Sequence, residues 1–182
     1  MKPIFFTGYM ASGKTTVGQH LAARLGLQFI DMDLFIENRY RKTVSEIFEE
    51  RGESGFREIE RRALQEVAYF ENVVISTGGG LPCFFDNMEV MNATGLTVYL
   101  KTSAAELANR LATAYQKRPL IKGKSSEELK EFVKNSLQQR QPFYEKAAII
   151  IDCETLFESG KLNEKIEEIM ILTGQIPVHK RQ

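Results

Sequence analysis

The stretch FFTGYMASGKTTVG, Phe5–Gly18, decides the fold of this 182-residue chain. Gly8, Gly13, Lys14 and Thr15 fit the pattern G-x-x-x-x-G-K-[ST], in which glycines let backbone N–H groups approach phosphates closely. The lysine of this pattern reaches the β and γ oxygens, and the hydroxyl after it faces Mg²⁺. An apolar strand pattern precedes the motif and an amphipathic helix pattern follows it, which disfavours a chance glycine turn. The stretch therefore predicts a nucleotide-phosphate site between a strand and a helix.

Strand-like and helix-like segments alternate along the rest of the chain, which predicts a parallel sheet with helices on both faces. The expected strands are Ile4–Phe6, Leu27–Ile30, Val73–Ser76, Leu96–Leu100 and Ala148–Ile151. The expected helices are Lys14–Leu25, Leu34–Phe70 with breaks near Gly52 and Gly55, Asp86–Met91, Ala104–Tyr115, Ser126–Gln139 and Leu162–Leu172. The fold class is therefore α/β, a three-layer α/β/α domain with a five-stranded parallel sheet over residues 1–182.

Composition and charge narrow the kind of protein. Hydrophobic residues make up 43% of the chain and charged residues 26%, which is typical of a globular protein with a buried core. Lys plus Arg and Asp plus Glu number 24 each, and this balance disfavours nucleic acid as the main partner. Two cysteines, Cys83 and Cys153, provide no disulfide framework and favour a reducing compartment. With no signal-peptide or membrane-span pattern, we expect a cytoplasmic protein.

A pair of carboxylates follows the second expected strand. Asp31 and Asp33 in FIDMDLF are two residues apart, so they face the same side of extended chain. In a parallel sheet, ligands bind at this carboxyl end of the strands. One carboxylate can face Mg²⁺ through water while the other accepts a hydrogen bond from an incoming hydroxyl. The alternative is that Asp33 only caps the helix that begins at Leu34.

Two arginines lie where a small anion could be bound. Arg140 continues the apolar stripe of the helix Ser126–Gln139, so it faces inward, although it could also serve only the helix C-terminus. Arg57 has Glu60 three residues on, which can hold the guanidinium in place, although a solvated pair is the commoner outcome. Two fixed arginines would make a bidentate clamp for a substrate carboxylate.

Two loops complete the expected site. Gly78, Gly79 and Gly80 follow the third strand, where glycines let a ligand touch the backbone; the alternative is a flexible turn before Pro82. The basic loop YQKRPLIKGKSS, residues 115–126, carries Arg118, which could act as a lid arginine that stabilises transition-state charge. Its alternative is a solvated lysine-rich surface loop.

Together these pieces resemble the shikimate kinase family. The motifs GYMASGKTT, DMD, FR, STGGG, RPL and RQPFYEKAA occur in family order over roughly residues 4 to 152. The resemblance implies a P-loop kinase of the nucleoside-monophosphate-kinase type, with a substrate-binding insertion at about residues 33–62 and a lid at about 112–125. It also implies a monomer that uses ATP and Mg²⁺ to phosphorylate the 3-hydroxyl of shikimate, in chorismate and aromatic amino acid biosynthesis.

The resemblance also implies residue roles. Lys14, Asp33 and Arg118 would be catalytic, with Asp33 taking the hydroxyl proton, and Thr15 and Asp31 would serve Mg²⁺. The substrate would contact Asp33, Arg57, Gly78, Gly79, Gly80 and Arg140. The nucleotide would contact Gly8, Ala11, Ser12, Gly13, Lys14, Thr15, Thr16, Arg110 and Arg118, with Arg110 against adenine.

Two departures and two rivals accompany this hypothesis. Ala11 stands where family members often have glycine, and we expect only a slight effect from so small a side chain. The family's adenine loop usually has a proline shortly after its Ile-Asp pair, here Ile151–Asp152, and this chain has none until Pro177. The rivals are another small-metabolite P-loop kinase, such as a gluconate kinase, and an inactive nucleotide-sensing module.

Overall fold

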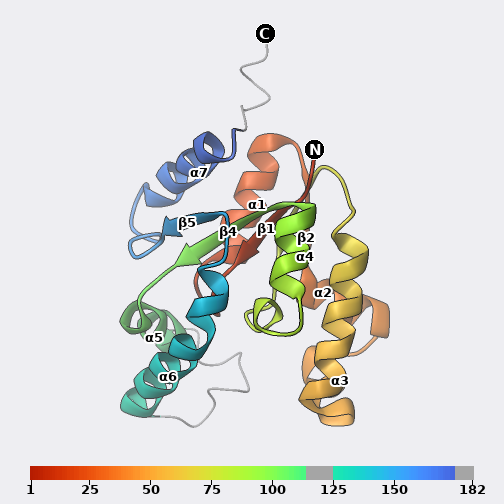
Figure 1. Ribbon diagram of the computed structural model, residues 1–182. Coiled ribbons are helices and arrows are strands. Elements are labelled where there is room, and N and C mark those ends of the chain that lie inside the picture. Colours follow the sequence, from red (N-terminus) through yellow and green to blue (C-terminus); the bar gives the residue numbers. More distant parts are fainter. Residues whose placement is uncertain (114–124, 175–182) are drawn as a thin grey trace.

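The structure, a computed structural model, describes residues 1–113 and 125–174. A sheet of five parallel strands lies in the middle of the molecule, in the order β2-β3-β1-β4-β5 (Figure 1). The strands are β1 (Ile4–Thr7), β2 (Gln28–Asp31), β3 (Val73–Ser76), β4 (Leu96–Lys101) and β5 (Ile149–Asp152). The helices are α1 (Lys14–Leu25), α2 (Met32–Tyr40), α3 (Val44–Val67), η1 (Leu81–Cys83), α4 (Asn87–Thr94), α5 (Ala104–Thr113), α6 (Ser126–Tyr144) and α7 (Lys161–Leu172). The predicted five-stranded parallel sheet is confirmed.

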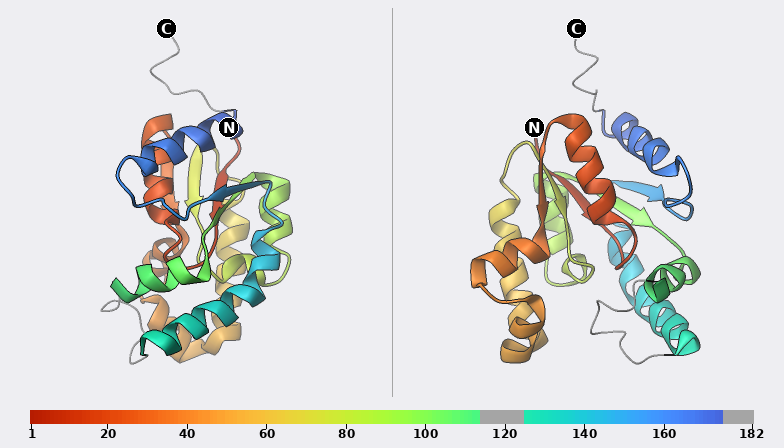
Figure 2. Two further views of the ribbon diagram at one scale, coloured as in Figure 1. Left: turned by 90° about the vertical axis from the view of Figure 1, so that its left-hand side faces the viewer. Right: turned by 180° about the vertical axis from the view of Figure 1, so that it is seen from behind.

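The central strands β1, β3 and β4 are largely buried because helices cover both faces of the sheet, whereas the edge strands β2 and β5 are partly exposed (Figure 2). Neighbouring residues on a strand point to opposite faces, so β1 sends Phe6 toward α1 and α7 and Phe5 toward α3 and α4. A third apolar cluster, around Tyr99 and Tyr144, joins α5 and α6 to the end of the sheet. The first two clusters fill the two faces of the sheet, and the third packs α5 and α6 beside it.

Helix boundaries follow from local chemistry at most ends. Gly26 ends α1 in a left-handed conformation, with φ 69°, as expected for a C′ glycine. Thr43 and Ser125 each form a capping box with the glutamate three residues on, at the starts of α3 and α6. These caps lie outside the apolar stripes, so they set helix start points independently of core packing.

Several predicted boundaries differ from the structure, most of them by one to three residues. The expected helix Leu34–Phe70 is two helices, α2 and α3, and only Gly52 interrupts α3, with φ 66° and ψ −179°; Gly55 is helical. The helix predicted to end at Gln139 continues to Tyr144, because Pro142 disrupts only one backbone hydrogen bond while Tyr144 packs in the core.

Within residues 1–113 and 125–174, no helix has the length and apolarity needed to cross a membrane.

Candidate functional site

The phosphate loop connects β1 to α1 and is shaped by residues in unusual backbone conformations. Gly8 has φ 139° and Gly13 has φ 100°, values that L side chains rarely adopt. Ala11 is left-handed as well, with φ 64°, so the position where the family often has glycine requires a conformation that costs alanine free energy. Lys14 Nζ donates hydrogen bonds to the carbonyl oxygens of Gly8 (2.9 Å) and Tyr9 (2.8 Å). The carbonyl oxygens at the start of the loop therefore face the ammonium group of Lys14.

A cavity of about 510 Å³ opens between this loop and the carboxyl ends of β2 and β3. Its lining brings together many of the residues singled out in the sequence: Ala11, Gly13, Lys14, Thr15, Thr16, Asp31, Asp33, Gly78, Gly79 and Arg110. Thr77, Glu106 and Phe157 also line the cavity, and sequence reasoning did not single them out. Phosphate-loop groups, two carboxylates and the glycine run thus share one concave surface.

Thr15 and Asp31 lie next to each other at the floor of this cavity. The Thr15 hydroxyl donates a hydrogen bond to Asp31 Oδ2 at 3.0 Å. The other oxygen of Asp31, Oδ1, accepts from the backbone N–H of Asp33 at 3.1 Å and caps α2. The helix-capping role considered for Asp33 therefore belongs to Asp31. Mg²⁺ is usually held in such sites by one or two protein oxygens, waters and phosphates, so this sparse oxygen pair fits the ion.

Asp33 lies in the first turn of α2 and faces the glycine run. A Cβ built on Gly78 would lie 2.9 Å from Asp33 Oδ1 and 3.0 Å from Glu60 Oε1. Burial raises the pKa of Glu60 to about 7, against the opposing effect of Arg57. Two carboxyl groups therefore converge on Gly78, and a side chain at this position would have to displace them.

Arg57 is buried on α3 and is held by carboxylates. Its guanidinium donates to Glu60 Oε2 at 2.5 Å and to Glu53 Oε1 at 3.0 Å, and its side chain is 9% exposed. Burial lowers the pKa of Arg57, and the two carboxylates more than offset this, so the pKa is raised overall. A Cβ on Gly80 would lie 2.6 Å from both terminal nitrogens. The predicted Arg57–Glu60 pair is thus a buried ion pair against the glycine run, not a solvated one.

Arg140 reaches the same glycine run from α6. A Cβ on Gly79 would lie 3.8 Å from Arg140 Nη1, and the guanidinium carbon is 5.6 Å from the centre of the Tyr9 ring. The hydroxyl of Tyr144 donates to the carbonyl of Gly79 at 2.5 Å and fixes the orientation of that peptide. Arg57 and Arg140 therefore approach Gly80 and Gly79 from different helices.

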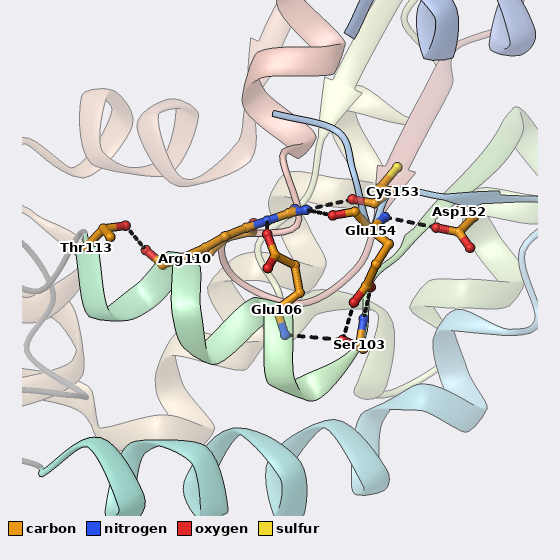
Figure 3. Close-up of polar contacts among 8 residues, drawn as sticks. Ser103, Glu106, Arg110, Thr113, Asp152, Cys153 and Glu154 are labelled. Carbon is orange, nitrogen blue, oxygen red and sulfur yellow. Dashed lines mark hydrogen bonds and ion pairs between the residues drawn. The ribbon is translucent and has the colours of Figure 1, made fainter. Parts of the chain in front are cut away.

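Arg110 lies on the other side of the cavity, near the end of α5 (Figure 3). It donates to Glu106 through Nε at 2.7 Å, and Nη2 donates to the carbonyl oxygens of Cys153 (2.6 Å) and Glu154 (2.9 Å). Nη1 lies 3.4 Å from the carbonyl oxygen of Ala11. The edges of the guanidinium are therefore used by protein acceptors.

The loop after β5 is fastened to Ser103, which directly precedes α5, and to Arg110 of α5, although it lacks the proline expected from the resemblance. Figure 3 shows Glu154 reaching Ser103, whose backbone N–H and hydroxyl donate to the carboxylate at 2.8 and 2.6 Å. Asp152 Oδ1 accepts the backbone N–H of Glu154 at 2.9 Å. With the Arg110 bonds to its carbonyls, these contacts hold the loop in place without a proline.

Several sequence-predicted residues fall outside this cavity lining. Gly8 and Ser12 belong to the phosphate loop, while Gly80, Arg57 and Arg140 lie beyond Gly79. Arg118 and most of the predicted lid lie outside the described residues. Glu53 is a further partner of Arg57 that was not predicted, although its spacing of four residues from Arg57 is a signal for such a pair.

Comparison with known protein families gives a consistent result. The family model described as shikimate kinase matches residues 10–170. A shikimate kinase of Parabacteroides distasonis is 56% identical over 170 residues, which cover 93% of this chain and 98% of that protein.

Solved structures of similar proteins agree with the fold. A 1.7 Å crystal structure of shikimate kinase from Bacteroides thetaiotaomicron has a TM-score of 0.92 and 49% identity, covering 95% of this chain and 98% of that one. Shikimate kinase from Acinetobacter baumannii in complex with shikimate has a TM-score of 0.81 and 33% identity, covering 100% and 96%. Sequence and fold similarity therefore both extend over nearly the whole chain.

Proposed function

The chain belongs to the shikimate kinase family of phosphotransferases, and from this premise we propose how its residues divide the work of moving the γ-phosphoryl group of ATP to the 3-hydroxyl of shikimate. The observation that carries the proposal is the glycine run Gly78–Gly80. Asp33 and Glu60 approach its first residue, Arg140 its second and Arg57 its third, next to the phosphate-loop cavity. Two guanidinium groups and a carboxylate around bare backbone suit a small carboxylate that bears hydroxyls.

On the substrate side, Arg57 and Arg140 bind the carboxylate and Asp33 orients the acceptor hydroxyl. In the transfer, the hydroxyl oxygen forms a bond to the γ-phosphorus, and the bond from that phosphorus to the bridging oxygen of ADP breaks. The hydroxyl proton passes to Asp33 and then to solvent. Because this transition state is loose, positioning and charge stabilisation matter more than a strong base.

On the nucleotide side, the phosphate loop binds the phosphates. Backbone N–H groups between Gly8 and Thr16 face the phosphates, and Lys14 balances the charge that develops on the transferred group. Thr15 and Asp31 would hold Mg²⁺, which neutralises phosphate charge when bound. Arg118 is assigned to the same charge stabilisation from the lid, and Arg110 is assigned to adenine. We also expect a cytoplasmic monomer.

The test is ADP release measured by a coupled assay with shikimate, gluconate or water as acceptor. We expect ADP release only with shikimate. Release without any acceptor would indicate an ATPase, and release only with gluconate would indicate the rival kinase. The variants Asp33→Asn and Arg140→Ala should each abolish transfer while ATP affinity stays within a few-fold, because neither residue belongs to the phosphate loop. Near-native turnover in either variant would contradict its assigned role.

A further inference from the structure

Helix α3 carries two arginines one turn apart, and each lies over one of two consecutive phenylalanines. The guanidinium carbon of Arg57 is 4.3 Å from the centre of the Phe84 ring, and that of Arg61 is 4.8 Å from the centre of the Phe85 ring. We propose that Phe84 is a positioning residue, which holds the guanidinium of Arg57 in the orientation that binds the substrate carboxylate. This inference rests on the role proposed above for Arg57.

Arg57 needs a positioning contact because its hydrogen bonds leave part of the group unconstrained. Glu60 and Glu53 bind the two terminal nitrogens, but the buried Nε has no hydrogen-bond partner among the described residues. Glu53 is also a weak anchor, since its side chain is 60% exposed. The guanidinium can therefore tilt about its bond to Glu60 unless something packs against its face.

Phe84 is the aromatic ring best placed to supply that packing. The rings of Phe56 and Phe48 also lie near Arg57, but at 5.4 and 5.7 Å rather than 4.3 Å. A cation over an aromatic face is attracted more strongly when both groups are shielded from water, and the side chain of Arg57 is only 9% exposed. The geometry thus favours Phe84 as the main contact on the face of the guanidinium.

The backbone that carries the ring of Phe84 is itself held in place by the loop. Asn87 donates from its side-chain amide to the carbonyl of Leu81 at 2.9 Å and from its backbone N–H to the carbonyl of Phe84 at 3.3 Å. Phe85 takes a left-handed conformation, with φ 51°, which turns the chain between the two rings. The loop is therefore closed on both sides of Phe84.

The second arginine–phenylalanine pair fastens this loop to α3 without facing the substrate residues. Arg61 donates to Asp86 at 2.9 Å and lies over the ring of Phe85, a residue that is 48% exposed. Because α4, which follows the loop, also packs against α3 (Figure 1), the loop and α3 are held together at several points. Phe85 is consequently a matched control for Phe84, with the same side chain in the same loop.

The test compares Phe84→Leu with Phe85→Leu in steady-state kinetics. We expect Phe84→Leu to raise KM for shikimate about tenfold, with kcat and KM for ATP within about twofold, because the lost contact acts on ground-state binding of the carboxylate. Phe84→Tyr, which keeps the aromatic face, should restore KM to within about twofold of the wild type. Phe85→Leu should leave all three constants within about twofold, whatever its effect on melting temperature.

Combination with Arg57→Ala separates positioning from general loss of structure. In that background, Phe84→Leu should add no further change in KM for shikimate, since the residue that it positions is gone. Equal KM changes for the two leucine variants, or the same added change with and without Arg57, would overturn the inference. If Phe84→Leu does not fold, Phe84→Met provides the same comparison with a side chain of similar volume. A wild-type KM for shikimate in Arg57→Ala alone would instead contradict the proposed function.

Discussion

Arg57 and Arg110 are two helix arginines that share the same solvent exposure and use their guanidinium groups in opposite ways. Each side chain is 9% exposed, each pairs with a glutamate on its own helix, and each lies near an aromatic ring. The other polar partner of Arg57 is another carboxylate, that of Glu53, whereas Arg110 also binds main-chain carbonyl oxygens. The partners, not the burial, distinguish the two sites.

This difference indicates what each arginine can offer to a ligand. A carboxylate on a flexible exposed side chain, such as Glu53, can be exchanged for the carboxylate of a substrate, so Arg57 can bind an anion edge-on. Backbone carbonyls cannot move away, so the edges of Arg110 stay occupied and the face of its guanidinium opposite Phe157 is what remains for a ligand. Edge-on binding suits a carboxylate, and face-on stacking suits a nucleotide base.

The largest expected effect comes from removing Arg57, the arginine that offers the edge of its guanidinium to the substrate carboxylate. Arg57→Ala should lower kcat/KM for shikimate by about 10²- to 10³-fold, because a charge-assisted pair in a desolvated site is lost. KM for ATP should stay within about twofold, since Arg57 is outside the phosphate-loop cavity. Arg62→Ala, an exposed position on the same helix, is the control. An equal loss in both variants would show that the effect is not specific to the edge of Arg57.

A second expected effect is the pH dependence of stability caused by Glu60. Its pKa is raised to about 7 in the folded protein, so the folded state keeps a proton that the unfolded chain releases. The free energy of unfolding, compared with that of Glu60→Gln, should therefore fall by about 3 kcal/mol as pH rises from roughly 4.5 to 7, then stay constant. Urea unfolding of both proteins across this pH range measures the difference.

Glu53→Gln is the matched control for this titration, because it removes the other carboxylate partner of Arg57 at an exposed position. The free energy of unfolding of Glu53→Gln, measured relative to that of Glu60→Gln, should still fall between roughly pH 4.5 and 7, because Glu60 is intact in this variant. A difference between wild type and Glu60→Gln that does not change with pH would contradict the assignment to Glu60.

Removal of Arg110, the arginine that offers its face to a ligand, should have a smaller effect, and this effect should concern ATP rather than shikimate. Arg110→Ala should raise KM for ATP about tenfold, with KM for shikimate unchanged within about twofold, because a stacking contact is lost. Arg110→Lys should not restore KM, since lysine carries a charge but no flat face. Full restoration by lysine would contradict face-on binding. Arg24→Ala, which breaks an exposed ion pair between α1 and α7, is the control.

The smallest expected effect concerns the loop that holds Arg110. Glu154→Gln should raise KM for ATP about two- to threefold, because a neutral amide binds Ser103 more weakly than a carboxylate does. Glu158→Gln, at an exposed position in the same loop, should leave KM unchanged. Steady-state kinetics with varied ATP would distinguish the two variants. Identical KM values for ATP would show that Glu154 does not contribute to nucleotide binding.

Sequence patterns predicted most of the fold because its signals are local. The phosphate loop, five apolar strands and Gly26 predicted the sheet and the end of α1, and these are confirmed. The end of α6 was wrong because Tyr144 packs against Tyr99, a residue far away in sequence. Tertiary packing of this kind leaves no mark in a short window.

The same contrast holds within the candidate site. Spacing on one helix predicted the Arg57–Glu60 pair, which the structure contains. Contacts between elements, such as Phe84 over Arg57 or Arg110 against the carbonyls of Cys153 and Glu154, depend on side-chain and backbone directions that no spacing rule encodes. The catalytic roles themselves stay predictions.

Ala11 gives the phosphate loop a use in protein engineering. Its left-handed backbone costs an alanine about 1 kcal/mol more than a glycine, while its contact with Arg110 uses the carbonyl oxygen, which every residue has. Replacing it with glycine relieves that strain but gives the unfolded chain more freedom, so the two effects largely cancel. Position 11 is therefore a place where the stiffness of the loop can be altered almost independently of the stability of the protein.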